Sequence, residues 1–164
     1  MTVIEGPPTD EHAEVWLTPD QLASWLSVVR LITRLPWAID AQLQRSAGLS
    51  MTEYMTMAML AKAPRRIMRM SDLAELTSSS LSRLSHLVKR LESQGYVRRE
   101  ADSADGRFTN AILLPAGLSK LESAAPGHVA HVRQLVIDIL SPERLRRLGQ
   151  DADRIVQRID SPAR

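Results

Sequence analysis

Apolar side chains recur at intervals of three and four residues along most of the chain, which is the spacing of helices that bury one face. The first such run follows Thr18-Pro19-Asp20-Gln21, where threonine can cap a helix and glutamine can complete a capping box. We expect this helix to kink or break locally at Pro36 and to end near Gly48. Its apolar positions are Leu22, Trp25, Leu26, Val29, Ile32 and Leu35.

Three further helical segments are predicted in the middle of the chain. A second capping box, Ser50-Met51-Thr52-Glu53, opens a methionine-rich helix. Ser71 is placed to cap a short helix with the sequence DLAEL, and small polar residues at 77–79 then form a turn. A longer helix is expected from about Ser80 to Gln94.

Two strands are expected after these helices, at Tyr96–Glu100 and Thr109–Leu114, with the polar loop ADSADGRF between them. A single hairpin buries little surface on its own, so it must pack against the neighbouring helices. Helices resume at Pro115, with a distortion or interruption expected at Pro126-Gly127, and again at Ser141. The predicted fold class is therefore mainly α with a small β-hairpin wing, in which a winged helix-turn-helix carries additional N- and C-terminal helices.

The composition removes several kinds of chemistry. The chain has 164 residues and no cysteine, which excludes disulfides, thiol nucleophiles and cysteine-based metal sites, and a cytoplasmic location is expected. No apolar run approaches the roughly 18 residues of a membrane span, so no membrane partner is expected. The first residues have no basic stretch followed by an apolar one, so they read as a flexible arm and not as a signal peptide.

Charge is unevenly distributed along the chain. Residues 62–107 hold ten Lys or Arg and six Asp or Glu, whereas residues 1–61 hold three basic and seven acidic side chains. The net charge is therefore +4 for residues 62–107 and −4 for residues 1–61. A concentration of positive charge is typical of a module that binds a polyanion, although a merely solvated basic surface has the same composition.

The helix beginning near Ser80 has two chemically different faces. Its apolar side is expected to pack inward and consists of Leu81, Leu84, Leu87, Val88 and Leu91. Its opposite side presents Ser82, His86, Lys89 and Ser93, flanked by Arg83 and Arg90. Small donors and cations on one helical face can approach phosphates and base edges. An ordinary solvated face is the alternative, but the short helix and tight turn directly before it match a helix-turn-helix layout.

The loop between the strands adds a second basic element. Its tip contains Asp102, Asp105, Gly106 and Arg107. An arginine on a wing can enter the minor groove of DNA, where negative potential is concentrated, and Asp105 can orient its guanidinium through a bidentate pair. The alternative is an exposed turn in which Asp-Gly only serves the backbone.

The stretch RMSDLAELTSSSLSRLSHLVKRLESQGYVRREADSADGRFTNAILLPAG resembles the DNA-binding core of the MarR family of multiple antibiotic resistance regulators. The matching elements are DLAEL, LSRLSHLVKRLESQGYVRR and the D-G-R wing before an apolar strand and a helix. The chain departs from the family pattern at the turn TSSS and at LLPAG, where many members have LTxxG. Neither departure removes a DNA-contacting group.

This resemblance implies a homodimer joined by the first helix and the last two. It implies double-stranded DNA as the partner, with recognition helices in successive major grooves of a pseudo-palindrome and wings in the flanking minor grooves. It also implies that small aromatic or lipophilic ligands can weaken DNA binding. Surplus apolar positions in the terminal helices independently favour a shared interface.

These arguments define a set of expected segments and site residues. The segments are a flexible N-terminal arm (1–17), an N-terminal dimerisation helix (18–48), the winged helix-turn-helix DNA-binding domain (49–114) and C-terminal dimerisation helices (115–164). Asp105 is expected to orient the wing. The expected DNA-contacting residues are Ser80, Ser82, Arg83, His86, Lys89, Arg90, Arg99 and Arg107. No catalytic residue, cofactor or metal is expected, and repression is the default mode because a dimer on a promoter most simply blocks it.

A ligand pocket is predicted between the first two helices and the DNA-binding part. Its candidate lining is Trp37, Met51, Tyr54 and Met55, with Met59 nearby, because methionines form adaptable apolar walls. Core packing is the simpler explanation of the same cluster. His128 and His131 lie one helical turn apart, a spacing that suits a metal, but no carboxylate or third histidine accompanies them.

Two other functional classes stay open at this point. One is an enzyme in which Asp102, Asp105 and His86 form an acid–base set. No nucleophile elbow, phosphate-binding loop or zinc-protease motif accompanies these residues. A protein–protein adaptor that uses the helix-turn-helix only as a scaffold is the other class. Salt-dependent binding to duplex DNA separates a regulator from both.

Overall fold

The computed structural model describes residues 16–102 and 105–161, and the chain divides into two compact units, Met1–Trp37 and Ala38–Arg164. A long helix, α1 (Pro19–Ala47), begins in the first unit and ends in the second. The capping box at its start is formed, since the backbone N–H of Thr18 donates to Gln21 Oε1 at 2.9 Å and that of Gln21 to Thr18 Oγ1 at 3.3 Å. Of the kink or local break expected at Pro36, the break does not occur, because the helix continues through that exposed residue.

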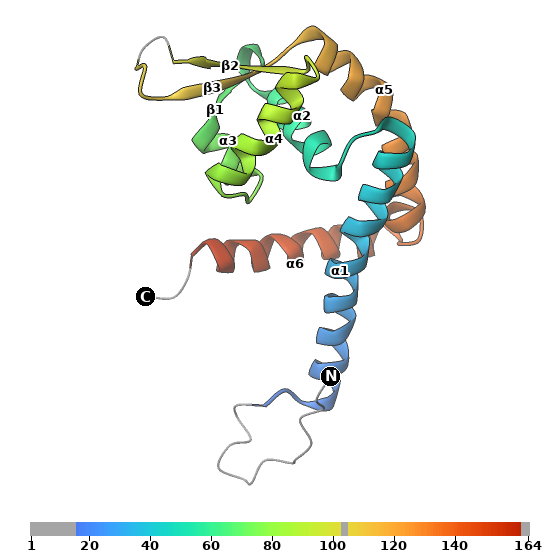
Figure 1. Ribbon diagram of the computed structural model, residues 1–164. Coiled ribbons are helices and arrows are strands. Elements are labelled where there is room, and N and C mark those ends of the chain that lie inside the picture. Colours follow the sequence, from blue (N-terminus) through green and yellow to red (C-terminus); the bar gives the residue numbers. More distant parts are fainter. Residues whose placement is uncertain (1–15, 103–104, 162–164) are drawn as a thin grey trace. The chain divides into compact units, whose positions relative to one another are not determined.

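The second unit contains the remaining helices and all the strands of the described chain (Figure 1). Their order is α2 (Met51–Lys62), a 3-10 turn (Pro64–Arg66), β1 (Ile67–Arg69), α3 (Met70–Leu76), α4 (Leu81–Ser93), β2 (Val97–Ala101), β3 (Thr109–Leu113), α5 (Pro115–Val132), a π-helical turn (Arg133–Ile137) and α6 (Pro142–Asp160). A helix-turn-helix followed by a hairpin is therefore present where the sequence placed it.

The sheet has three strands and not the two that the sequence predicted. The order is β1-β3-β2, and both pairs are antiparallel, with Ile67 opposite Ile112 and Val97 opposite Leu113. The additional strand, β1, has only three residues, Ile-Met-Arg, which are too few to show a period-two pattern. Its pairing with β3 attaches the base of the wing to the segment that leads into α3 (Figure 1).

The core of the second unit lies where α4 meets its neighbours. Leu84, Val88 and Leu91 are at most 1% exposed, as the helical periodicity predicted, and Leu73 of α3 and Val97 of β2 are equally buried. Leu81 was also expected to face inward, and this is wrong, since 55% of it is exposed. It is the first residue of α4, so its side chain lies beyond the end of the core.

Local capping determines where α2 and α4 begin. Ser50 and Glu53 form the reciprocal capping box, and Ser80 Oγ accepts from the backbone N–H of Arg83 at 3.3 Å. The cap predicted for Ser71 is wrong: α3 begins at Met70 without a side-chain cap, and Ser71 Oγ donates to Asp72 Oδ1 at 2.8 Å. The incoming chain is already aligned there by β1, which ends at the residue before α3.

Helix α5 begins at Pro115 and continues through Pro126, so the interruption that the sequence allowed there does not occur. The irregular segment comes later, as the π-helical turn Arg133–Ile137. The first turn of α5 is held close to the α4–β2 connection at Gly117. A Cβ there would overlap the carbonyl oxygen of Tyr96 and lie 2.8 Å from Leu113 Cδ1.

Large apolar side chains remain exposed on the terminal helices. They include Leu22, Trp25, Leu26 and Ile32 on α1 and Leu148, Ile155, Val156 and Ile159 on α6. Within the described residues, no helix is long and apolar enough to cross a membrane. Helices α1 and α6 thus each carry exposed apolar side chains alongside polar ones, as amphipathic helices do.

Candidate nucleic-acid interface

The outward face of α4 is exposed and carries basic side chains that have no ion-pair partner among the described residues. Ser82, Arg83, His86 and Lys89 are all exposed. The side chains of Arg83, His86 and Lys89 form no hydrogen bond or ion pair with any residue that the structure describes. These groups are thus available to an outside acceptor. Ser80, also expected to contact DNA, uses its hydroxyl as the cap of the same helix.

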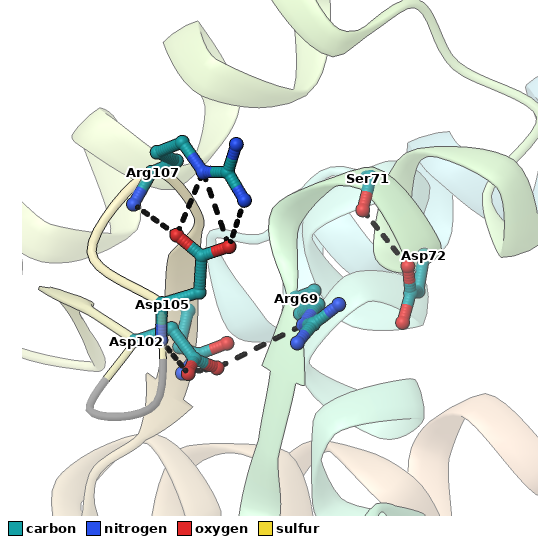
Figure 2. Close-up of polar contacts among 7 residues, drawn as sticks. Arg69, Ser71, Asp72, Asp102, Asp105 and Arg107 are labelled. Atoms are coloured by element: carbon teal, nitrogen blue, oxygen red, sulfur yellow. Dashed lines mark hydrogen bonds and ion pairs between the residues drawn. The ribbon is translucent and has the colours of Figure 1, made fainter.

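The wing holds its arginine in a fixed orientation (Figure 2). The side chain of Arg107 is 86% exposed, yet its Nε and Nη2 donate to Asp105 Oδ1 at 2.9 Å and Oδ2 at 2.6 Å. The backbone N–H of Arg107 also donates to Asp105 Oδ1, at 3.1 Å. Hydrogen bonds from the Arg107 side chain and backbone hold the pKa of Asp105 below its ordinary value. The bidentate geometry anticipated for Asp105 is therefore present.

A second set of contacts fastens the base of the wing to β1. Asp102 accepts from the backbone N–H of Asp105 at 3.2 Å and from Asn110 Nδ2 at 3.0 Å, and its Oδ2 lies 3.7 Å from Arg69 Nε. The guanidinium of Arg69 stacks over the ring of Phe108, 4.4 Å from its centre. Figure 2 shows Arg69 reaching across to the wing from its own strand. The sequence did not identify Arg69 because this role depends on β1.

A hollow of about 250 Å³ lies beside the wing and α4. Three arginines from separate strands and the wing tip contribute to its wall together with two serine hydroxyls. Its lining comprises Arg69, Met70, Ser71, Leu81, Ser85, Arg99, Arg107, Phe108 and Thr109. The three guanidinium groups on this hollow are suited to a phosphate group of a nucleic-acid backbone, because each carries five N–H donors and its carboxylate partner occupies only some of them.

Like Arg107, two more of the predicted DNA-contacting arginines have carboxylate partners inside the protein. Arg90 Nε donates to Glu53 Oε1 at 2.6 Å. Arg99 Nε and Nη2 donate to Glu92 Oε2 at 3.1 and 2.8 Å, which joins β2 to the end of α4. The backbone and side-chain hydrogen bonds from Arg99 lower the pKa of Glu92. The expected set therefore splits into unpaired groups on α4 and arginines that also act as intramolecular ties.

This geometry has close counterparts among solved structures. A family model described as the MarR family matches residues 47–107. The structure of Sco3205, a MarR family transcriptional regulator from Streptomyces coelicolor in complex with DNA, is 43% identical with a TM-score of 0.85, and the match covers 90% of this chain and 96% of that one. The chain belongs to the MarR family.

Other solved relatives agree with this assignment. AbsC, a MarR family transcriptional regulator from S. coelicolor, is 36% identical with a TM-score of 0.85, and the match covers 89% of this chain and 98% of AbsC. The DNA complex of S. aureus MepR shares the fold at 18% identity, with a TM-score of 0.68 and coverage of 87% of this chain and 98% of that one. No curated protein sequence matches the chain. The structure is thus that of a MarR family transcriptional regulator with a DNA-binding winged helix.

The methionines predicted to line a ligand pocket occupy a hollow of this MarR-family fold. Met51 and Met55 line a space of about 260 Å³. The other lining residues are Thr52, Met59, Leu76, Thr77 and Ser78. Tyr54 is not part of this lining. Its side chain is buried, and its ring centre lies 4.5 Å from that of His128 on α5. Trp37 belongs to the first unit and is 74% exposed.

The two histidines on α5 lie in a partly buried environment. His128 Nδ1 and His131 Nε2 are buried and have no hydrogen-bond partner among the described residues. Burial, reinforced by the proximity of His131, lowers the pKa of His128, and burial raises that of Tyr54. Within the described part of the chain, no three His, Cys, Asp or Glu side chains form a group that could hold a metal.

Proposed function

We propose that this MarR family regulator is a ligand-responsive repressor that binds a pseudo-palindromic DNA operator as a homodimer. The observation that carries the proposal is the combination of two basic surfaces. The face of α4 presents Arg83, His86 and Lys89, which have no partner within residues 16–102 and 105–161, and the wing presents Arg107 beside an arginine-lined hollow. The relative Sco3205, with the same fold, was solved in complex with DNA.

The two surfaces are suited to different parts of a duplex. An α-helix fits the major groove, where each base pair presents a distinct set of donors and acceptors, so α4 would read sequence. The minor groove offers a degenerate pattern but concentrated negative potential, so Arg107 would supply affinity more than specificity. Asp105 would keep the guanidinium from adopting orientations that cannot reach the groove.

The direct test is the selection of binding sites from random duplexes, followed by titration of the selected and a scrambled duplex at several salt concentrations. A regulator gives a steep salt slope together with a sequence-specific remainder. An enzyme or an adaptor built on this scaffold would show neither. Binding without any preference for the selected duplex would contradict the proposal.

The dimer is supported by the exposed apolar faces of α1 and α6, because two copies can bury them against each other. Two copies also match the two half-sites of a pseudo-palindrome. Deleting residues 141–164 should give a monomer or an aggregate in sedimentation experiments. A well-folded dimer after that deletion would place the interface elsewhere.

The ligand response is supported by the methionine-lined hollow at Met51 and Met55. Adaptable apolar walls are suited to an aromatic carboxylate or a similar amphipathic molecule. Such a ligand acts only if it binds the DNA-incompetent state more tightly than the competent one. Isothermal titration calorimetry against a panel of phenolic compounds should measure ligand binding, with DNA affinity measured in parallel. If no compound both binds and changes DNA affinity, the methionines serve packing alone.

A further inference from the structure

One buried carboxylate connects the start of α2 to the recognition helix. Glu53 is 3% exposed, and its two oxygens have separate partners. Oε2 accepts from the backbone N–H of Ser50 at 2.7 Å and from Ser50 Oγ at 2.8 Å, while Oε1 accepts from Arg90 Nε at 2.6 Å. The same side chain therefore completes a helix cap and forms an ion pair with a residue 37 positions later.

The start of α2 is also attached to the end of α1. Asp40 Oδ1 accepts from the backbone N–H of Met51 at 2.7 Å. Both residues belong to the second unit. Three helices thus meet at one polar junction. Its hydrogen bonds connect Asp40 of α1 to the first turn of α2, and the Ser50–Glu53 cap of α2 to Arg90 of α4. The junction consists of backbone and charged groups with fixed hydrogen-bond directions.

Such a junction restrains α4 in a way that apolar packing does not. The buried face of α4 consists of leucine and valine side chains, whose close-packed contacts hold the helix in place but have no hydrogen-bond direction of their own. A charge-assisted hydrogen bond to a buried carboxylate is short and directional. It resists rotation, and Arg83 and His86 move with the same rigid helix.

We propose that Glu53 is a positioning residue for DNA recognition, which sets the orientation of α4 through Arg90. The proposal rests on the proposed function, because it presupposes that α4 reads the operator. It also gives Arg90 a role other than direct phosphate contact. The two roles of Arg90 lead to opposite expectations when Glu53 loses its charge.

The experiment replaces the charge and keeps the cap. Glu53→Gln retains one acceptor oxygen for Ser50, but its amide NH2 then faces the Arg90 Nε–H, donor against donor, so the bond to Arg90 is lost. The full-length variant is titrated with the selected and scrambled duplexes at several salt concentrations. We expect about tenfold weaker binding to the selected duplex, an effect within the range measured for pairs of contacting residues. Binding to the scrambled duplex should change by no more than about twofold. The salt slope should stay the same.

A phosphate-contacting Arg90 gives the reverse pattern. Glu53→Gln would then release the guanidinium, strengthen binding to both duplexes and steepen the salt slope. That result would overturn the proposal, and so would unchanged binding to both duplexes. If the wild-type protein shows no preference for the selected duplex, the proposed function fails first, which keeps the two failures distinct.

Two further variants keep the test independent of folding. Arg90→Gln changes a side chain that is 58% exposed but leaves the buried Glu53 carboxylate without its cation, so the thermal unfolding of each variant is measured beside DNA binding. The double variant Glu53→Gln/Arg90→Gln should bind the selected duplex no more weakly than either single variant, because both remove one interaction. Additive losses would contradict the proposal. Glu122→Gln is the matched control: it makes the same change of charge at an exposed residue of α5 that has no partner among the described residues, and it should leave binding unchanged.

Discussion

Removing the wing arginine tests the electrostatic part of DNA binding. Arg107 exposes 86% of its side chain, and Nε and Nη2 are occupied by Asp105. The guanidinium still offers donors on its other edge, because a guanidinium carries five N–H groups. Arg107→Ala should therefore remove one phosphate or minor-groove contact for each wing on the duplex and weaken binding to most sequences.

The size of the effect follows from counterion release. Each phosphate contact contributes about 0.9 to the slope of log affinity against log salt, so Arg107→Ala should flatten that slope by about one unit per wing. Raising the salt fourfold, from about 50 to about 200 mM, weakens binding about 3.5-fold for every such contact. The affinity gap between wild type and variant should shrink by this factor per wing over the same range.

Fluorescence anisotropy on selected and scrambled duplexes measures both slopes. Asp105→Asn is the companion variant, because it keeps the arginine and removes an acidic charge close to the DNA. If Asp105 orients Arg107, this variant binds more weakly despite the more favourable net charge. Stronger binding would show that Asp105 only opposes the DNA electrostatically. An unchanged salt slope in Arg107→Ala would refute the wing contact itself.

Three other results are expected. Arg83→Ala should lose its base preference at one or two positions per half-site, roughly 1–3 kcal/mol of discrimination, while non-specific binding survives. The assignment of specificity to α4 and of affinity to the wing is falsified if Arg83→Ala weakens binding to both duplexes equally while Arg107→Ala spares the scrambled one. Gly117→Ala should destabilise the fold by about 1–3 kcal/mol in urea denaturation, because the added Cβ would overlap Tyr96 and Leu113. Gly149→Ala on α6 is the control and should not destabilise the fold, because nothing lies within 4 Å of the added Cβ. The pKa of His128 is lowered in the folded state, so the unfolded chain binds more protons as the pH falls below about 6.5, and stability drops with it. His128→Phe should reduce this acid-induced fall in Tm, and an identical pH profile would contradict the assignment.

The features that the sequence predicted correctly are local. The cap at Ser50 with Glu53 and the cap at Ser80 each depend on residues three positions apart, and both are formed. The inward positions Leu84, Val88 and Leu91 follow from helical geometry alone. Such features need only the neighbouring residues, so they can be inferred before the fold is known.

The features that the sequence missed depend on distant partners or on the ends of elements. β1 exists because β3 supplies its hydrogen bonds from more than 40 residues away. Leu81 has a core-like position in the pattern, yet lies beyond the core because α4 begins there. Pro36 and Pro126 remain within helices, and both are exposed, so water can reach the backbone carbonyls that proline leaves unpaired.

The sequence by itself determined the class of the molecule: a winged helix-turn-helix whose cations gather on α4 and the wing. Periodicity, caps and charge are encoded residue by residue, so they need no tertiary information. Only the tertiary structure decided which of these arginines have a carboxylate partner, because Arg83 and Arg90 lie on the same helix and the sequence alone assigned both to DNA. Arg90 meets the buried Glu53 of α2, whereas the described residues leave Arg83 without a partner. The physical reason is that an ion pair requires two groups within a few ångströms, a distance that chain folding alone sets.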